Sequence, residues 1–537
     1  MYQLNTYPLE YILSFVKRYR YWLTASSGIV LFCSFPSVNF FPLAWIALVP
    51  LLVALEPVEN WKSAFSIGYV AGFVFFAGLL LAIILLYPYA NIFATLLGYI
   101  LLVGYTALYF AVFSVLVHKL PWQSGIMFPL AVASIWVALE WVRSWLLTGF
   151  PWGNIGYSQW KYLPGIQIAS LTGAYGISFV IVFFNAGIAT LIRCRQEWQK
   201  ELVAVIVPCS LAAICLIYGY AAIATSEKTS QKSMKVAIIP GNISQIEKWK
   251  SENIEKIIKK YLNLTRKAAV ENPDVIVWPE TTVRGRTIAG EWGAHVSYRQ
   301  WKKFQNLFRQ TFGEIGGIPM LIGATDLDAF GDLYNRVISV SSEGEILGKY
   351  AKMHLVPFGE YVPLADFLPN FVQFHPFEHG KTVNLLPITN VETMQTNKKQ
   401  IEVGTSICFE SAFPNHFRQF VKKGADAMGI LTNDAWFVGT AFPELHLAMA
   451  PLRAVENRIA VFRCANGGYT CVVDSFGRIR TPFVTPQTTE KFLIADVPLS
   501  EGKLTFYTRY GNWLPILCLV LSILCIAYGI VIRYANK

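Results

Sequence analysis

Three residues of the chain have side-chain types that could together perform acyl transfer. Glu280 ends the run DVIVWPE, Lys352 lies in KYAKMHLVPFGEYVP, and Cys408 ends VGTSIC. A thiol is weakly ionised near neutral pH and needs a base or a nearby positive charge to become nucleophilic. A carboxylate can take the thiol proton, and an ammonium can stabilise the oxyanion that forms when a thiolate attacks a carbonyl. The set therefore predicts catalysis through a thioester.

Residue types alone leave a structural interpretation open for each of the three. A cysteine after a strand is commonly a packing residue, a glutamate can cap a helix, and a lysine in a loop is commonly solvated. The chemistry depends on whether the fold brings the three side chains together.

Short β-branched runs are predicted to be the strands that position these residues. They cover 234–242, 274–280, 319–325, 336–342, 403–410, 426–434 and 469–474. Apolar residues recur at helical spacing from Ile246 to Leu264, and further helices are expected around 296–312 and 444–458. Strands interleaved with helices predict an α/β layered domain, in which functional residues lie at strand ends.

The rest of the chain has the composition of a membrane protein. Apolar residues make up 54% and charged residues 15% of its 537 residues, against roughly 25% charged in soluble domains. A spanning helix needs about 20 mostly apolar residues. Eight such segments are predicted, near 22–37, 40–56, 63–86, 91–117, 122–147, 166–192, 200–223 and 512–533.

This pattern predicts an N-terminal membrane domain of about seven helices over 1–227, an inserted catalytic domain over 228–505, and a final membrane helix within 506–537. With eight crossings, the basic residues at the ends of the apolar runs all fall on one side, which the positive-inside rule identifies as the cytoplasm. The catalytic domain is therefore expected to face outward.

The net charge of +11 does not point to nucleic acid, because the basic residues form no dense tract and no nucleic-acid motif occurs. Nine cysteines are present, without a CxxC pair or a zinc-type spacing. We expect no nucleic-acid partner, no disulfide framework, no metal and no organic cofactor.

Two features of the membrane part admit more than one interpretation. The loop TGFPWGNIGYSQW (148–160) could form an interfacial aromatic belt or line a path for lipid. Glu140 and Arg143 interrupt an apolar segment three residues apart, where they could pair with each other. A structural role for this pair is the simpler interpretation.

Several motifs resemble the nitrilase superfamily and, within it, the apolipoprotein N-acyltransferase family. They are WPE at 278–280, KxHLVPFGE at 352–360, CFE at 408–410 and LTNDAWF at 431–437. The resemblance extends over nearly the whole chain, through LTGFPWGNIGYSQ at 147–159 and PGNISQIEKW at 240–249. It implies an αββα sandwich for the outward domain.

The resemblance also implies residue roles. Glu280 matches the family's general base, Lys352 its oxyanion-stabilising lysine and Cys408 its acylated nucleophile. Five further residues match supporting positions of the family: Glu360, Glu410, Trp249, Asn335 and Pro363.

The reaction implied is a two-step transfer in the inner membrane of a diderm bacterium. The cysteine would take an acyl chain from a phospholipid, typically phosphatidylethanolamine. It would then pass the chain to the α-amino group of the diacylglyceryl cysteine of an apolipoprotein. A monomer without metal or organic cofactor is expected.

Four positions depart from the family pattern: Val438 replaces a glycine, Leu445 a glutamine, Phe409 a tyrosine and Asn512 an aspartate. None is one of the three catalytic positions, but the lost glycine puts the mobility of the 436–446 loop and substrate preference in question.

Two other functions would account for parts of the sequence. A membrane-anchored amidase could use the same three residues on small amides, although such substrates would not require eight membrane helices. A transporter would predict repeated or broken helices, and no internal repeat of that kind is found.

Overall fold

The computed structural model describes residues 9–88, 91–120, 125–194, 198–226, 232–284, 306–307, 309–328, 330–362, 376–389, 400–484 and 491–535. The chain folds into two compact units. The helical unit comprises Met1–Ala224, Thr440–Leu445 and Asn512–Lys537, and the α/β unit comprises Thr225–Gly439 and His446–Gly511.

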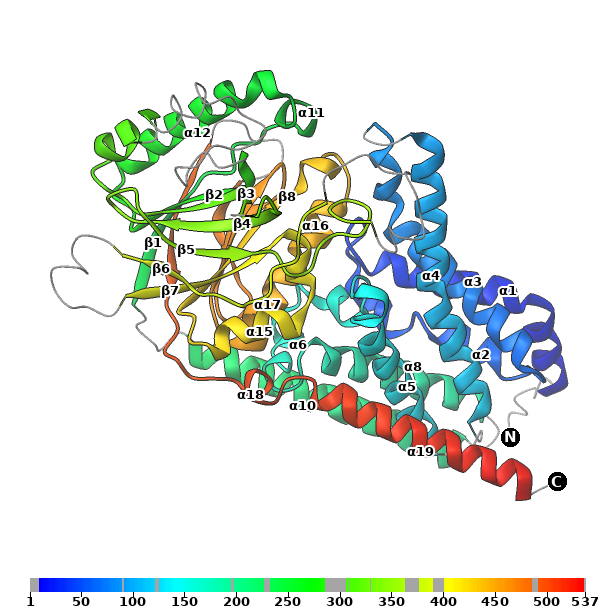
Figure 1. Cartoon of the computed structure of the whole chain (residues 1–537). Coiled ribbons are helices and arrows are strands. Elements are labelled where there is room, and N and C mark those ends of the chain that lie inside the picture. Colours follow the sequence, from blue (N-terminus) through cyan, green and yellow to red (C-terminus); the bar gives the residue numbers. More distant parts are fainter. Residues whose placement is uncertain are drawn as a thin grey trace. The chain divides into compact units, whose positions relative to one another are not determined.

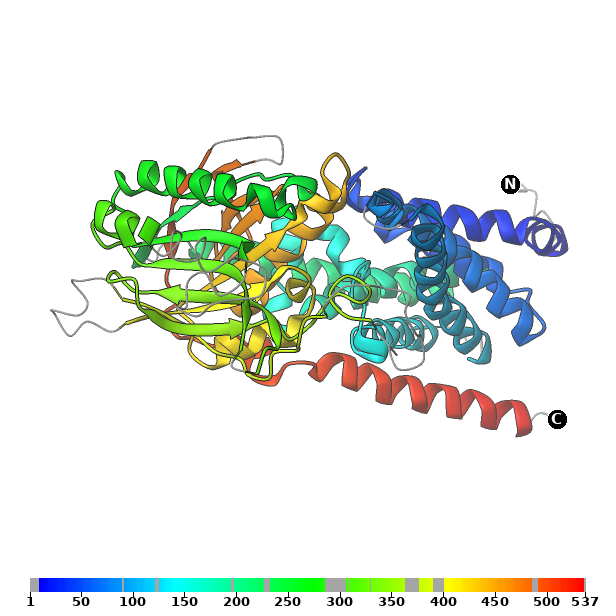
Figure 2. The same ribbon diagram turned by 45° about the horizontal axis from the view of Figure 1, so that its top comes forward.

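The helical unit is built from long apolar helices joined by short turns (Figure 1). Its α-helices are α1 (Leu9–Cys33), α2 (Val49–Leu55), α3 (Trp61–Leu79), α4 (Ile92–Lys119), α5 (Met127–Arg143), α6 (Leu163–Ile166), α7 (Ala169–Thr172), α8 (Ala174–Arg193), α9 (Trp198–Glu201), α10 (Val203–Ser226) and α19 (Trp513–Ala535). Helix α3 packs against α1 and α4, and α5 packs against α8 and α19, as Figure 2 shows from a second direction.

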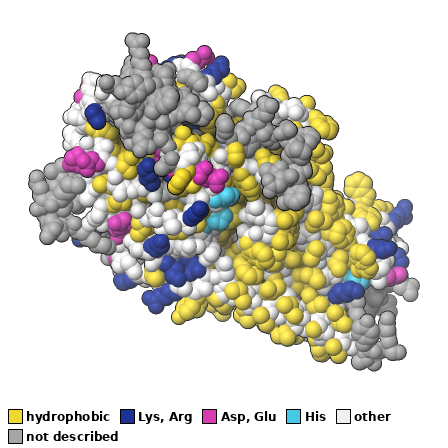
Figure 3. All heavy atoms as spheres, viewed as in Figure 1, with side chains coloured by type: hydrophobic (Ala, Val, Ile, Leu, Met, Phe, Trp, Pro, Cys, Tyr) yellow, Lys and Arg dark blue, Asp and Glu magenta, His cyan; other side chains and the backbone are white. Residues whose placement is uncertain are grey.

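Five helices of the described residues are long and apolar enough to cross a membrane: Trp61–Leu79, Ile92–Lys119, Ala174–Arg193, Trp198–Thr225 and Trp513–Ile532. Hydrophobic side chains cover most of the visible face of this unit (Figure 3). The helical unit is therefore that of a membrane protein, since water would not favour so extensive an apolar surface.

The predicted count of eight spans is not confirmed. Residues 40–56 fold into a 3-10 helix, η1 (Phe41–Trp45), and the short α2. Helix α5 has 17 residues, and α1 carries a cluster of basic residues near its middle. Eight crossings stay a prediction.

The loop predicted as an aromatic belt lies inside the helical unit. Trp152, Tyr157 and Trp160 are only 3%, 1% and 4% exposed, so the belt interpretation is wrong for these three rings. Trp152 stacks on Phe442, a residue of the Thr440–Leu445 segment, with ring centroids 4.5 Å apart. In the same segment Glu444 accepts from Lys161 Nζ at 2.8 Å.

Glu140 and Arg143 hold this loop in place. Glu140 Oε1 accepts from the main-chain N–H of Ile155 at 2.7 Å and from Trp136 Nε1 at 2.9 Å, and Arg143 Nη2 donates to Asn154 Oδ1 at 2.7 Å. The expected structural role fits, but the hydrogen bonds reach the loop as well as the helix. Each buried polar group thereby offsets the cost of leaving water.

The α/β unit is a sandwich of two six-stranded sheets (Figure 1). The first sheet contains, in spatial order, β12 (Leu493–Pro498), β1 (Ser233–Ile238), β2 (Val275–Arg284), β3 (Met320–Leu327), β4 (Leu333–Val340) and β5 (Ile346–Ala351). The second contains β11 (Ile479–Val484), β10 (Thr470–Val473), β9 (Val461–Asn466), β8 (Ala427–Asn433), β7 (Ile401–Ile407) and β6 (Leu386–Ile388).

The two sheets share one plan. In each, three central strands run parallel, namely β1–β2–β3 and β7–β8–β9, and antiparallel strands flank them. Strand β2 contacts β8 and β9 of the other sheet, so the central strands are buried on both faces. This explains their nearly continuous apolar sequences.

Helices cover the outer faces of the sandwich. Helix α12 (Ile254–Ala269) packs on β2, while α15 (Pro414–Lys422) and α17 (Met449–Asn457) pack on β7 and β9. The core under α12 is centred on Trp278, which is fully buried and donates from Nε1 to Thr265 Oγ1 at 3.0 Å. Shorter helices are α11 (Gln245–Lys248), α16 (Phe442–Leu447) and α18 (Phe506–Tyr510).

All seven predicted strands are present, whereas β5, β6, β9, β11 and β12 were not predicted. The predicted helices at 246–264 and 444–458 correspond to α11 with α12 and to α16 with α17. The predicted helix at 296–312 lies mostly outside the described residues.

The hydrogen bonds of Glu140 lead to a stability prediction. Glu140→Ala leaves two buried N–H donors without their acceptor, and each such loss costs about 1–3 kcal/mol. We expect a lower midpoint of thermal unfolding in detergent. Glu59→Ala is the control, because Glu59 is 82% exposed and meets Lys17 only at 3.5 Å. Equal midpoints for the two variants would contradict the proposed anchoring.

Candidate active site

Glu280 is placed by an interruption in strand β2. The pairing of β2 with β3 shifts between Trp278 and Val283, where Pro279 removes a ladder donor. Thr281 follows with a φ of 51°. Gly323 of β3 permits this irregular backbone to approach, because a Cβ there would lie 2.1 Å from Pro279 O. The carboxylate of Glu280 is 5% exposed and accepts from Asn433 N at 2.8 Å through Oε2.

Lys352 directly follows β5 and is buried, with 1% exposure. Its Nζ donates to Glu360 Oε1 at 2.9 Å and to Glu280 Oε1 at 3.1 Å. Asn335 of β4 donates from Nδ2 to the same two oxygens, at 2.9 Å and 2.8 Å. The structure thus brings together four residues that the sequence analysis had singled out from three separate motifs.

Electrostatics keep this lysine charged. Burial alone would lower its pKa, but the carboxylates of Glu280 and Glu360 outweigh burial, and the pKa of Lys352 lies above its ordinary value. The ammonium is therefore available to stabilise negative charge on a substrate. Glu360 Oε2 is itself fixed by Val356 N at 2.8 Å.

Cys408 begins the 3-10 turn η8 (Cys408–Ala412) at the end of β7. Its φ of 52° lies in the left-handed region, which costs a non-glycine residue of order 1 kcal/mol or more. The turn is held by Glu410, whose Oε2 accepts from Ile407 N at 2.8 Å, and by Ser411 Oγ, which donates to Cys408 O at 3.0 Å. Strain at a functional residue is maintained by such surrounding contacts.

Glu410 ties the cysteine turn to the segment that follows Lys352. Its Oε1 accepts from Met353 N at 2.6 Å, His354 N at 3.1 Å and Tyr350 Oη at 2.7 Å. Burial would raise the pKa of Glu410, but His416, His354 and the main-chain N–H of Ile407 prevail and lower it to about 2. Glu410 is therefore an ionised structural bridge between two functional loops.

The thiol of Cys408 is protonated at rest. Burial and the negative charge of Glu280 raise its pKa, and Lys352 lowers it only in part. A nucleophilic thiolate would form only when a base removes the proton. Glu280 and Lys352 both interact electrostatically with this thiol, so the carboxylate, the ammonium and the thiol belong to one cluster.

A second buried network adjoins Cys408, and the sequence analysis did not identify its members. Asp434 accepts from His446 Nδ1 at 2.9 Å and from Arg463 Nη2 at 2.5 Å. His446 Nε2 lies 3.1 Å from Cys408 O and 2.9 Å from Ser411 Oγ. Burial would raise the pKa of Asp434, but Arg463 and His446 lower it to about 2. The motif LTNDAWF contained Asp434, whereas nothing local marked His446 or Arg463.

Two sets of side chains in the described residues have metal-ligand types within 4.8 Å of one another: Cys408, Asp434 and His446, and His354, Glu410 and His416. In each set the carboxylate is already engaged by hydrogen-bond donors. The carboxylates of Asp434 and Glu410 thus have hydrogen-bond partners within the protein.

The sequence analysis also named Trp249, Pro363 and Val438. Trp249 is 43% exposed at the end of α11, and its supporting role stays a prediction. Pro363 lies outside the described residues. Val438 has a φ of −56°, which any residue adopts, so its replacement of a glycine introduces no backbone strain.

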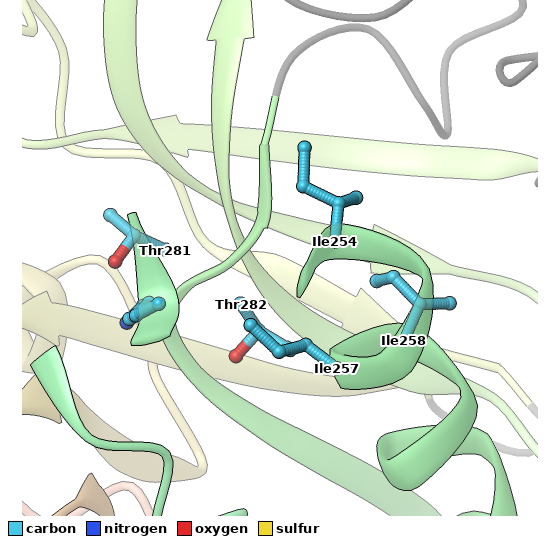
Figure 4. Close-up of a pocket in the computed structure, with 6 residues that line it drawn as sticks. Ile254, Ile257, Ile258, Thr281 and Thr282 are labelled. Carbon is cyan, nitrogen blue, oxygen red and sulfur yellow. The ribbon is translucent and has the colours of Figure 1, made fainter. Parts of the chain in front are cut away.

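Lys248, which the sequence analysis did not identify, holds the backbone of Glu280 in place. Its buried Nζ donates to Glu280 O at 2.8 Å. Figure 4 shows the small hollow that Lys248 lines together with Thr281, Thr282 and isoleucines of α12. None of the three reactive side chains lines this hollow, so it is a packing feature of the α12 face.

The buried imidazole of His354 leads to a pH prediction. Burial and the neighbouring His416 lower the pKa of His354 to about 4. The unfolded chain, with an ordinary pKa of about 6.5, therefore binds the proton first, and folding free energy is lost as pH falls from about 6.5 to 4, by up to about 3 kcal/mol. Thermal unfolding of His354→Gln across this range should show a shallower slope than wild type. His379→Gln should change the slope far less, because His379 is exposed and is the last of the groups that lower the pKa of His354; identical slopes for all three proteins would contradict the assignment.

Two family models match consecutive parts of the chain. Residues 235–506 match the carbon-nitrogen hydrolase family, and residues 27–187 match the family described as the apolipoprotein N-acyltransferase N-terminal domain. Among solved structures, an amidase from Nesterenkonia sp. AN1 is 17% identical with a TM-score of 0.36, covering 50% of this chain and 92% of that one. Saccharomyces cerevisiae Nit3, of the nitrilase superfamily, is 20% identical with a TM-score of 0.34, covering 50% and 91%.

Curated relatives match over nearly their whole length. The apolipoprotein N-acyltransferase of Geobacter metallireducens is 35% identical over 507 residues, which are 93% of this chain and 92% of the relative. That of Chlorobaculum tepidum is 29% identical over 530 residues, which are 93% and 94%. With both domains matched in order and at full length, this chain belongs to the apolipoprotein N-acyltransferase family.

Proposed function

We propose that the protein transfers an acyl chain from a phospholipid, through a thioester on Cys408, to the α-amino group of the N-terminal diacylglyceryl cysteine of apolipoproteins. The observation that carries the proposal is the buried Lys352 ammonium, bound to both Glu280 and Glu360 and interacting with the Cys408 thiol. Full-length similarity to enzymes named for this reaction supports the choice of substrates.

In the first step Glu280 accepts the proton of the Cys408 thiol, and the thiolate sulfur attacks the ester carbonyl carbon of the phospholipid. The carbonyl π pair moves to oxygen, where Lys352 stabilises the negative charge. Collapse of this intermediate breaks the ester C–O bond and expels the lysophospholipid alkoxide, which takes the proton back from Glu280. The product is a thioester on Cys408.

In the second step the α-amino group of the lipoprotein attacks the thioester carbonyl. Lys352 again stabilises the oxyanion, and Glu280 takes a proton from the amine. Collapse breaks the C–S bond and forms the amide; the sulfur leaves with the electron pair and then takes the proton from Glu280, which restores the thiol and the base. Splitting the transfer at a thioester replaces one difficult reaction by two easier ones.

The supporting residues act by position. Glu360 and Asn335 fix the ammonium and the base through their hydrogen bonds, and Glu410 holds the cysteine turn. Trp249 and Pro363 belong to the proposal through the family resemblance alone.

The proposed setting is the bacterial inner membrane, with a membrane domain at 1–227, a periplasmic catalytic domain at 228–505 and a membrane helix at 506–537. Eight spans would put Lys119 and Arg193 on the cytoplasmic side with the N-terminal basic cluster. The five long apolar helices support membrane insertion. Phosphatidylethanolamine is the proposed donor, and the enzyme is proposed to act as a monomer.

The decisive experiment is an intact-mass measurement after incubation with phosphatidylethanolamine in detergent. Wild type should gain the mass of one acyl chain, because the thioester forms before any acceptor arrives. Cys408→Ala should gain none while inserting normally in the membrane. Absence of the added mass on wild type, or its persistence in Cys408→Ala, would sink the mechanism. Turnover of small amides without acyl transfer would favour an amidase instead.

The base assignment is tested by Glu280→Gln. The amide cannot take the thiol proton, so we expect acylation of Cys408 to slow by roughly 10²-fold or more. Single-turnover rates with phosphatidylethanolamine measure the effect. Glu314→Gln, at an exposed ion pair with Arg266, is the control and should react like wild type. Unchanged acylation in Glu280→Gln would remove it as the base.

A further inference from the structure

Thr432 lies beside the proposed nucleophile on the neighbouring strand. Strands β7 and β8 run parallel with Ile407 opposite Leu431, so Cys408 and Thr432 follow at the next position of each strand. Thr432 is fully buried, and its hydroxyl is close enough to the Cys408 thiol to lower the pKa of that thiol. Thr432 lies within the LTNDAWF motif at 431–437, but the sequence analysis assigned it no role.

The Thr432 hydroxyl has a choice of acceptors. It donates to Asp434 Oδ1 at 2.9 Å, and an oxygen of Asp434 lies within 4.8 Å of the Cys408 sulfur. A hydroxyl carries a single hydrogen, so it can serve the carboxylate or the sulfur but not both. Asp434 retains His446 and Arg463 as donors when the hydroxyl turns away. The Asp434 carboxylate therefore keeps hydrogen-bond donors when the Thr432 hydroxyl turns to the sulfur.

We propose that Thr432 is a further catalytic residue, whose hydroxyl turns from Asp434 to the Cys408 sulfur whenever that sulfur carries negative charge. The inference deepens the proposed acyl transfer and rests on it. The physical reason is that a hydrogen bond to a charged sulfur is stronger than one to a neutral thiol or thioester. Asp434 holds the hydroxyl in place between these moments.

The sulfur is anionic at two points of the reaction. In the first, the proton has moved to Glu280 and the thiolate has not yet formed the C–S bond. In the second, amine attack breaks the C–S bond and the sulfur leaves with the electron pair. In both, Thr432 donates to the sulfur, and between them the neutral thioester returns the hydroxyl to Asp434. No proton is transferred from Thr432.

The end of β8 then serves the site through three consecutive residues. Thr432 offers a hydroxyl to the nucleophile, Asn433 N donates to Glu280 Oε2 at 2.8 Å, and Asp434 holds the hydroxyl and His446. Since one strand end carries all three, the donor to the nucleophile and the donor to the base are fixed relative to each other. Lys352, from the other sheet, supplies the charge for the oxyanion.

The test compares Thr432→Val, which keeps the shape and removes the hydroxyl, with Thr432→Ser, which keeps the hydroxyl. Thr432→Ala is a second variant without the hydroxyl, for use where valine disturbs folding. The matched control is Thr405→Val, because Thr405 on β7 is equally buried and its hydroxyl has no hydrogen-bond partner among the described residues. All are made in the full-length protein in detergent.

Two readouts are taken: the single-turnover rate of Cys408 acylation by phosphatidylethanolamine, and the pH profile of Cys408 alkylation by iodoacetamide, followed by mass spectrometry of the Cys408 peptide. Loss of a hydrogen bond to a charged atom predicts a fall in acylation rate of about tenfold or more in Thr432→Val. The alkylation profile should move up by about one pH unit. Thr432→Ser and Thr405→Val should stay near wild type in both readouts.

The inference is overturned if Thr432→Val acylates and alkylates like wild type, or if Thr405→Val and Thr432→Ser lose as much as Thr432→Val. The first result would show that the hydroxyl is not used, and the second that only packing was disturbed. If wild type forms no acyl-enzyme, the proposed function fails. The alkylation profile then still decides whether the hydroxyl stabilises the thiolate.

Discussion

The buried ammonium of Lys352 is the constraint on which the rest of the α/β unit depends. A charge that leaves water must be matched by opposite charge and hydrogen bonds, or it is strongly destabilising. Two carboxylates meet it, and Asn335 occupies the same two carboxylate oxygens. One of those carboxylates, that of Glu280, is placed by three features: the interruption of β2, the glycine at 323 and the backbone N–H of Asn433.

The acidic side chains around this charge differ in what their environments allow them to do. Glu280 interacts with a thiol whose pKa is raised by burial, and it is positioned to exchange protons. Glu410 and Asp434 have pKa values near 2, so they stay charged throughout and act as fixed anchors for backbone and side-chain donors. Carboxylates in different environments thus suit different tasks: proton exchange, as proposed for Glu280, and fixed anchoring for Glu410 and Asp434.

Much of this arrangement could be predicted from sequence, and the exceptions share a cause. The central strands were recognisable because burial on both faces requires long apolar runs, and Glu280, Lys352 and Cys408 stand at the ends of such runs or in a marked motif. Strand β9 was missed because buried Arg463 and Asn466 interrupt its apolar pattern. Their partners, Asp434 and Asn433, lie about 30 residues away. Periodicity reports which face is buried, and it contains no information on polar pairs distant in sequence.

The six residues Thr440–Leu445 belong by their packing to the helical unit, although the chain on either side of them belongs to the α/β unit. Phe442 stacks on Trp152, and Glu444 meets Lys161. A fragment cut at the boundaries of the α/β unit would expose Phe442 to water and leave Glu444 without its lysine. The α/β unit is thus not a separable module, because the stretch of chain that forms it also contributes these six residues to the helical unit.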